Sequence, residues 1–175
     1  VFRKGGARPG DALVMSKPLG TGLVLAAGTG EQKAAAIAGM KALNRVASET
    51  LQSLGDAVHA VTDVTGYGLA GHGWEMAERS GVRVVIDTST LVAYEGALEA
   101  AAEGVRTGGD PRNRTYLTGH LDATAAAGPE AVCFDPQTSG GLLAAVTPDA
   151  AAQLVAGGWW QAGVAEAGGA RLILH

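Results

Sequence analysis

The sequence contains a single cysteine, Cys133, among 175 residues. One cysteine cannot form an internal disulfide, which agrees with a reducing compartment. Because the neighbouring Phe134 is apolar and no basic residue adjoins the thiol to lower its pKa, we expect an inert side chain rather than a nucleophile. The four histidines show no metal-ligand spacing with one another or with Cys133, which argues against a zinc site.

Long apolar runs and basic clusters are also absent. The apolar stretches are interrupted well before the ~20 residues that a membrane helix needs, and no signal peptide is evident. No basic run is longer than Arg3-Lys4, and the formal net charge is −4. Nothing therefore favours a nucleic-acid surface. We expect a soluble, cytoplasmic protein that binds neither membranes nor nucleic acids.

The composition is that of a globular protein. Hydrophobic residues make up 47% of the chain and charged residues 17%, which suits one domain with a sizeable core. Residue 1 is Val rather than Met, and residues 1–10 have the glycine- and proline-containing character of a linker. We therefore expect a piece of a longer protein, with a linker at 1–10 and a domain at 11–175.

Hydrophobic periodicity and turn residues predict interleaved strands and helices. Strands are expected at 11–17, 58–61, 82–87, 142–146, 160–165 and 171–174, the last two forming an antiparallel hairpin. Helices are expected at 31–54, 68–79, 95–103 and 148–155. The first helix contains Gly39 and could divide into two, the last has Thr147 as N-cap and Pro148 at its first position, and 104–119 is expected to be a surface loop. The pattern favours a mixed sheet with helices on its faces.

The densest motif is the stretch 62–72, in which Asp63 precedes a glycine-rich turn that opens a helix. Glycines let the backbone approach an anion, a helix start favours negative charge, and a carboxylate at that point needs a cation. Asp63 therefore indicates Mg²⁺ bound together with a phosphate ligand. The alternative is a structural turn whose acid caps the helix or faces solvent.

The same glycines also fit a dinucleotide-binding fingerprint. Gly66, Gly68 and Gly71 have the G-x-G-x-x-G spacing, and Asp87 follows Gly66 by 21 residues. However, such a fingerprint follows an apolar strand, and an acid such as Asp63 would repel a pyrophosphate that carries no metal. Nicotinamide binding is therefore the weaker interpretation.

Two further stretches have residue types that bind anions. The turn at 135–143 combines hydroxyls with paired glycines, and it either cradles an anion or packs beneath the first motif. The stretch 108–114 contains Arg112 and Arg114, which could reach phosphates or remain solvated. His72, on the helix behind the glycine turn, could cap, pack or reach a substrate.

Taken together, the strings at 10–22, 62–72 and 135–143, with Gly-Gly-x-x-Arg-Asn at 108–113, resemble the C-terminal domain of selenophosphate synthetases (selenide, water dikinases). The family is related to aminoimidazole ribonucleotide synthetase, thiamine monophosphate kinase and a hydrogenase maturation factor. The resemblance implies an α+β fold, a three-layer α/β/α sandwich with a mixed sheet. It also implies a reaction in which ATP, selenide and water give selenophosphate, AMP and orthophosphate.

The resemblance assigns roles to particular residues. Asp63 matches a position at which the family takes a Mg²⁺ ligand from its C-terminal domain. The residues expected to contact ATP are Thr65, Gly66, Gly68, Asn113, Thr138, Ser139 and Gly140. No catalytic residue is assigned in this chain, because the family's reactive Cys or selenocysteine, its nearby Lys and its other metal-binding acids lie in an N-terminal half.

The implied parent enzyme is a homodimer formed through an N-terminal domain that also supplies most of the ATP site. The 175-residue chain is accordingly expected to be inactive alone. Two alternatives stay open: the C-terminal domain of another ATP-using relative with a different acceptor, and a non-catalytic nucleotide-binding module.

Overall fold

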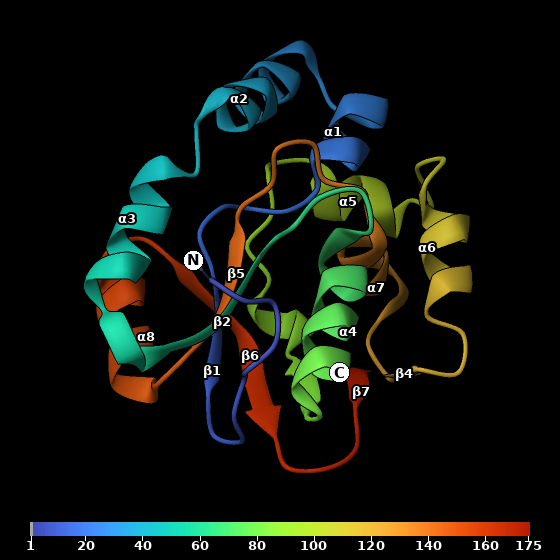
Figure 1. Ribbon diagram of the computed structural model, residues 1–175. Coiled ribbons are helices and arrows are strands. Elements are labelled where there is room, and N and C mark those ends of the chain that lie inside the picture. Colours follow the sequence, from blue (N-terminus) through green and yellow to red (C-terminus); the bar gives the residue numbers. More distant parts are fainter. Residues whose placement is uncertain (1) are drawn as a thin grey trace.

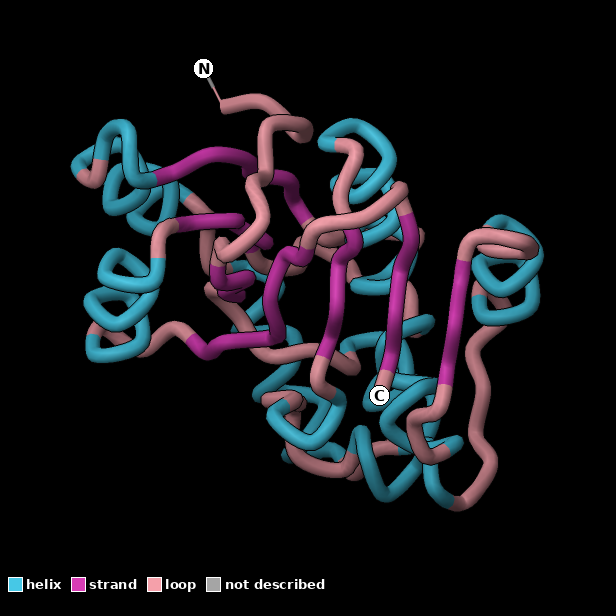
Figure 2. Tube along the Cα trace, turned by 90° about the horizontal axis from the view of Figure 1, so that it is seen from below, coloured by secondary structure: helices cyan, strands magenta, loops and turns pink. Residues whose placement is uncertain are grey.

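The computed structural model describes residues 2–175, which form one mixed β-sheet flanked by helices (Figures 1 and 2). The seven strands lie in the order β2-β5-β1-β6-β3-β7-β4. Pairing from β2 across to β3 is antiparallel, whereas β3 with β7 and β7 with β4 are parallel. The strands are β1 (Ala12–Met15), β2 (Val58–Asp63), β3 (Arg83–Ile86), β4 (Leu121–Ala123), β5 (Leu142–Val146), β6 (Trp160–Glu166) and β7 (Arg171–Leu174).

Helices cover both faces of the sheet, which confirms the α+β class and the three layers. In Figure 1, α3 and α8 lie on one side of the strands and α4, α5 and α7 on the other. The helices are α1 (Thr21–Ala27), α2 (Gly30–Lys41), α3 (Arg45–Ser53), α4 (Gly68–Ser80), α5 (Ala97–Ala102), α6 (Asp110–Tyr116), α7 (Ala127–Phe134) and α8 (Pro148–Ala156). Within residues 2–175, none of them combines the length and the apolar character that crossing a membrane requires.

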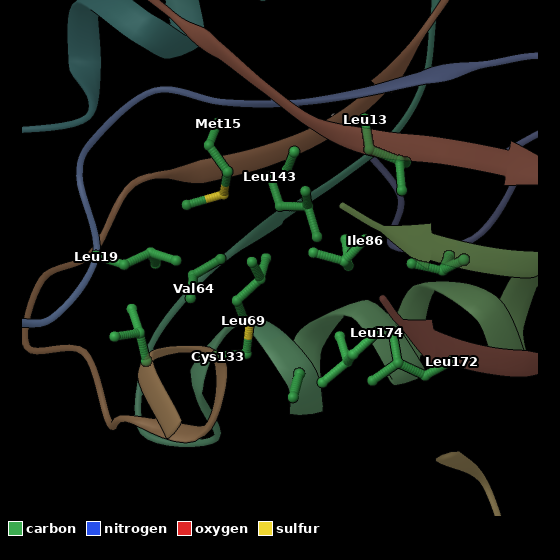
Figure 3. Close-up of a cluster of buried hydrophobic side chains, with 14 of the residues drawn as sticks. Leu13, Met15, Leu19, Val64, Leu69, Ile86, Cys133, Leu143, Leu172 and Leu174 are labelled. Carbon is green, nitrogen blue, oxygen red and sulfur yellow. The ribbon is translucent and has the colours of Figure 1, made fainter. Parts of the chain in front are cut away.

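Strand β1 shows how the sheet builds a core on each face. Side chains alternate along a strand, so Leu13 and Met15 point to one face and Ala12 and Val14 to the other. All four are buried. The first pair belongs to the larger core, where Figure 3 shows Leu13 and Met15 on the same side of the strands as Leu69 of α4. The second pair packs in the smaller core formed with α3 and α8.

The predicted terminal hairpin is wrong, although both of its strands exist. Strand β3 lies between β6 and β7, pairing antiparallel with β6 and parallel with β7. The Gly168-Gly169 turn therefore spans the position of β3 instead of closing a tight hairpin. Strand β3, which is apolar and buried except for Arg83, pairs with β6 and β7 on its two edges, and such a nonlocal choice of partner leaves no signal in the local sequence.

The predicted surface loop at 104–119 is also wrong, because it contains α6. Pro111 lies in the first turn of α6, and Asp110 is an acid at the same helix start, both of which are helix-start signals that the interpretation as a loop overlooked. Helix α6 is short and polar, so it has no long apolar stripe to reveal it. Helix α1, strand β4 and helix α7, which are similarly short, were also not predicted from the sequence.

The helical stretch at 31–54 does divide in two, but not at Gly39. The chain leaves the helix at Ala42 and re-enters it at Arg45, while Gly39 stays inside α2. A Cβ on Gly39 would collide with the hydroxyl of Tyr94, so the glycine serves close packing. Thr147 does occupy the N-cap of α8, but its side chain makes no capping hydrogen bond.

The predicted linker spans residues 1–10, of which residue 1 lies outside the described residues; residues 2–10 lie along the domain. The Arg3 carbonyl accepts a hydrogen bond from the Val61 N–H of β2 at 2.8 Å. Ser80 Oγ at the end of α4 accepts from the N–H groups of Gly6 and Ala7, both at 3.1 Å. This segment therefore packs against both β2 and α4. The boundary at residue 10 remains a prediction.

Candidate functional site

Two of the motifs singled out in the sequence meet at one end of the sheet. Strand β2 ends at Asp63, which is paired with Leu142 at the start of the antiparallel strand β5. One residue further, the Val64 N–H donates to the Gly141 carbonyl at 2.9 Å. The glycine turn after β2 and the hydroxyl-rich turn before β5 therefore lie side by side.

The string at 10–22 is attached to these two turns through Gln137, which lies in the hydroxyl-rich turn. Its Oε1 accepts from the N–H groups of Gly20 and Thr21, at 3.1 and 3.3 Å. Its backbone N–H donates to the Thr65 carbonyl at 3.0 Å. The strings at 10–22, 62–72 and 135–143 thus form one hydrogen-bonded unit.

Asp63 is solvent-exposed at this end of the sheet. Side chains alternate along β2, so Asp63 lies on the opposite face from the fully buried Val64, at the exposed end of the strand. Within residues 2–175, no hydrogen bond or ion pair reaches the Asp63 carboxylate. The carboxylate is therefore available to a cation, and neighbouring groups do not hold it inward.

The donor set nevertheless contains only one acid. No group of three or more His, Cys, Asp or Glu side chains that could hold a metal occurs in the described part of the chain. Magnesium is commonly held by one or two carboxylates together with substrate phosphates and water. Asp63 fits such a shared site, whereas a site made wholly by this chain is not supported.

The turn after Thr65 is supported from the interior by α6 and α7. Gly68 has a left-handed backbone, with φ of 69°, and a Cβ there would meet the Cys133 carbonyl, which places α4 directly against the end of α7. Asn113 of α6 is fully buried, and its amide donates to the carbonyls of Gly66 and Phe134 at 2.9 and 3.0 Å. The structure thus places Asn113 under the turn, while Gly66 lies on its exposed side.

The turn at Thr138, Ser139 and Gly140 is fixed by two residues that the sequence analysis did not select. Lys17 Nζ donates to the Ser139 carbonyl at 2.9 Å and to the Ala42 carbonyl at 2.6 Å. Asn44 Nδ2 donates to the Gly140 carbonyl at 2.8 Å. Both side chains attach the junction of α2 and α3 to the turn. Lys17 lies inside the string at 10–22, which was the available signal, whereas Asn44 lies outside all three strings.

Ser139 has an unusual backbone conformation. Its φ of 50° makes it the only non-glycine residue with positive φ in the described range, a state that costs free energy and often marks functional sites. Thr138 and Ser139 are exposed, whereas Gly140 is buried against the Val64 carbonyl. The surface therefore offers the exposed Asp63 and Gly66 and the half-buried Thr65 from one turn, and two exposed hydroxyls from the other.

The two arginines of the stretch 108–114, for which the sequence left phosphate contact or solvation open, differ in their surroundings. Arg114 donates to Asp110 at 2.8 Å and to Glu130, and its guanidinium lies over the Phe134 ring, 4.3 Å from the centroid. The Arg114 guanidinium is therefore paired with two carboxylates, and it links α6 to α7. Arg112 is exposed.

The dinucleotide interpretation does not fit the topology. It requires β2, α4 and β3 to form a unit with parallel neighbouring strands, but β5, β1 and β6 lie between β2 and β3. Asp87, the expected ribose-binding acid, accepts hydrogen bonds from Ser89 N and Oγ at 2.9 and 2.6 Å.

Asp135 links the hydroxyl-rich turn to α1. Its carboxylate accepts hydrogen bonds from the N–H groups of Gly22 and Leu23, from the Thr107 hydroxyl and from the Gln137 amide, at 2.9 to 3.2 Å. Burial raises the pKa of Asp135 to about 6, and these donors, which favour the anion, only partly oppose burial.

This raised pKa predicts a pH-dependent stability. The folded state holds the Asp135 proton more tightly than the unfolded chain, whose Asp pKa is about 3.9. The contribution is therefore fully present below about pH 4 and is lost as pH rises through about 6. We expect the free energy of unfolding in urea to fall by roughly 1 to 3 kcal/mol across that range. Asp135→Asn should flatten this fall, and equal slopes for the two proteins would contradict the assignment.

Cys133 is buried in α7, as the sequence suggested. Burial raises the pKa of its thiol to about 12, so almost no thiolate exists at neutral pH. We expect iodoacetamide to leave the native protein unmodified and to alkylate Cys133 after unfolding in urea, as measured by intact-protein mass. Labelling of the native protein at the unfolded rate would show that the thiol is accessible.

A separate groove of about 410 Å³ lies between α3 and α8, with Ser16, Lys17, Asn44 and Trp159 among its lining residues. Asp63 and Thr65 do not line it. The candidate site is thus an open surface at the end of the sheet, with Lys17 between it and this groove.

Comparisons with known proteins agree with this arrangement. The family model "AIR synthase related protein, C-terminal domain" matches residues 8–172. The chain is 43% identical over 159 residues to selenide, water dikinase of Trichlorobacter lovleyi, which covers 87% of this chain and 45% of the relative. It is 42% identical over 161 residues to the protein of the same name from Caldanaerobacter subterraneus, covering 88% and 46%. The chain therefore spans about half the length of these relatives.

Solved structures show the same fold at low identity. Hydrogenase maturation protein HypE in complex with ATP has a TM-score of 0.64 at 17% identity, covering 99% of this chain and 49% of that one. Thiamine monophosphate kinase from Aquifex aeolicus has a TM-score of 0.63 at 16% identity, covering 99% and 52%. On the family match and the identity to the relatives, this chain belongs to the family of AIR synthase related C-terminal domains and is similar throughout to the C-terminal part of selenide, water dikinases.

Proposed function

We propose that this chain is the C-terminal half of a selenide, water dikinase, which makes selenophosphate, AMP and orthophosphate from ATP, selenide and water. The observation that carries the proposal is the identity to proteins of that name across nearly the whole chain. In this reaction one of the two outer phosphoryl groups of ATP ends on selenium and the other on the oxygen of water. The parent protein is a phosphotransferase, and no catalytic residue is assigned to this half.

The role of this half is to bind and orient the polyphosphate. Asp63 would hold Mg²⁺, which when bound offsets the negative charge of the phosphates. The exposed Gly66 and half-buried Thr65 on one turn, and the exposed Thr138 and Ser139 on the other, are the groups on the two turns beside it. Helix α4 starts directly after the first turn without a side-chain cap, so its dipole adds a preference for anions. The ATP complex of the similarly folded HypE supports ATP as the ligand.

The open form of the site suggests that a second surface completes it. One exposed carboxylate and two turns leave a polyphosphate accessible to water on its far side, where phosphoryl transfer to selenide would compete with hydrolysis. We propose that an N-terminal half, like that of the longer relatives, closes the site and carries the remaining metal ligands. We also propose that the parent protein is cytoplasmic and forms a homodimer.

The proposal is tested with a two-half protein, in which the N-terminal half of the Trichlorobacter lovleyi relative is joined ahead of this chain. We expect it to form AMP from ATP only when selenide and Mg²⁺ are present, as measured by chromatography of the nucleotides. The 175-residue chain alone should form none. Selenide-dependent AMP formation by the chain alone, or ATP use by the two-half protein that selenide does not affect, would contradict the proposal.

A further inference from the structure

A chain of hydrogen bonds connects the candidate site to the interior of the molecule. Thr65 Oγ1 lies 3.1 Å from His72 Nε2, and His72 Nδ1 lies 2.9 Å from Glu75 Oε2. Lys4 Nζ donates to the same Glu75 oxygen at 3.1 Å. His72 is buried, whereas Thr65 is half-buried at the surface beside Asp63. The chain of contacts runs from Lys4, in the N-terminal segment, to a hydroxyl two residues from the exposed carboxylate.

The chemistry of these partners sets the direction of each hydrogen bond when the His72 ring carries one proton. Burial raises the pKa of the Glu75 carboxyl, but the hydrogen bonds from Lys4 and His72 outweigh burial, so its pKa lies below the ordinary value and Glu75 is an anion. A carboxylate only accepts, so His72 carries its proton on Nδ1. In the neutral imidazole Nε2 is then a bare acceptor, and the Thr65 hydroxyl donates to it.

This direction decides what Thr65 can offer to a ligand. Once its proton is directed to His72, the hydroxyl oxygen has only lone pairs left to present outside. Such an oxygen attracts a cation or a water bound to a cation, and it repels a phosphate oxygen. The arrangement matches the general use of a hydrogen-bonded outer partner to orient a metal-binding group.

We propose that His72 is a positioning residue that, held by Glu75, turns the Thr65 oxygen outward so that Thr65 and Asp63 act together as neighbouring oxygen acceptors for one hydrated divalent cation. The inference rests on the proposed function only for the presence of that cation. It assigns to Thr65 a contact with the cation shell in place of a direct hydrogen bond to phosphate.

Two substitutions distinguish the role of His72 as a hydrogen-bond acceptor for Thr65 from a role in packing alone. His72→Gln keeps an amide oxygen that can accept from Thr65, whereas His72→Leu keeps similar bulk without any acceptor. Both lose the imidazole N–H that binds Glu75, so both should lower the melting temperature to a similar extent. Binding of Mn²⁺ to the two-half protein with ATP, followed by electron paramagnetic resonance, should weaken about tenfold in His72→Leu and remain within about threefold of wild type in His72→Gln.

The role of the Thr65 hydroxyl is tested in the same Mn²⁺ titration. Thr65→Val removes the hydroxyl with little change of shape and should match His72→Leu, whereas Thr65→Ser should bind Mn²⁺ like the wild type. Equal Mn²⁺ affinity in His72→Gln and His72→Leu, or wild-type affinity in Thr65→Val, would overturn the inference. So would the absence of Mn²⁺ binding to the wild type.

A second measurement does not depend on catalysis. Nitrogen-15 NMR of the histidine-labelled 175-residue chain at mildly alkaline pH should show His72 as the Nδ1–H tautomer. An Nε2–H tautomer would overturn the inference. If the two-half protein failed to form AMP with selenide while the tautomer and the Mn²⁺ affinities followed expectation, the proposed reaction would fall and the role of His72 would stand.

Discussion

Asp63→Asn in the two-half protein is expected to lower selenide-dependent AMP formation by roughly 100- to 1,000-fold. Asn keeps the shape of the side chain but removes the charge that would hold Mg²⁺ beside the polyphosphate. Because Asp63 is exposed and its carboxylate makes no hydrogen bond or ion pair within residues 2–175, its loss should barely change the melting temperature. The measurements are the rate of AMP formation at saturating ATP and a thermal unfolding curve.

Asp56→Asn is the matched control for this loss of charge. Asp56 is also an exposed aspartate, and it lies in a short 3₁₀ turn before the opposite end of β2. We expect wild-type turnover from this variant. Equal activity in Asp63→Asn and Asp56→Asn would remove Asp63 from the metal site, and a large fall in the melting temperature of Asp63→Asn would point to a structural role.

Gly140→Ala is expected to destabilise the protein by about 3 kcal/mol or more, at the upper end of what overpacking costs. A Cβ at this position would collide with the Val64 carbonyl, which is backbone and cannot rotate away. Relief requires the turn before β5 to separate from the end of β2, where the Val64 N–H and the Gly141 carbonyl are hydrogen-bonded. Urea unfolding followed by circular dichroism measures the loss.

Gly66→Ala provides the contrast on the facing turn. No atom outside its immediate neighbours lies within 4 Å of a Cβ built at Gly66, and its φ is not in the left-handed region. We expect a change of less than about 0.5 kcal/mol in the free energy of unfolding. Equal destabilisation by the two substitutions would mean that Gly140 is not tightly packed against β2.

The glycines predicted to contact the ligand therefore have different structural roles. Gly66 is exposed and free to approach a ligand, whereas Gly68 and Gly140 are buried and bring pieces of backbone together. Glycine-rich sequence alone does not distinguish these uses, because both require the absence of a side chain. Asn113 is a similar case, since its amide supports the turn from the interior.

The prediction from sequence was most accurate where one element carries its own signal. Helix α4 begins at a glycine turn and ends at Gly81 with φ of 69°, so its bounds were predicted closely. The terminal strands were found, but their partners were not, because pairing depends on β3, which is distant in sequence. Helix α6 was missed because it is short and polar and is held by Arg114 and Asn113, whose partners lie on other elements.

The amino-acid sequence by itself determined that Asp63 precedes a glycine-rich turn, the order of the three motifs and the family to which the chain belongs. Those features are local, or are carried by strings of adjacent residues. Only the tertiary structure decided that the three motifs form one hydrogen-bonded unit and that Lys17 and Asn44 hold the second turn. It also decided that His72 contacts Thr65. Such contacts join groups far apart along the chain or across a helical turn, so their geometry exists only once the sheet and its helices have packed together.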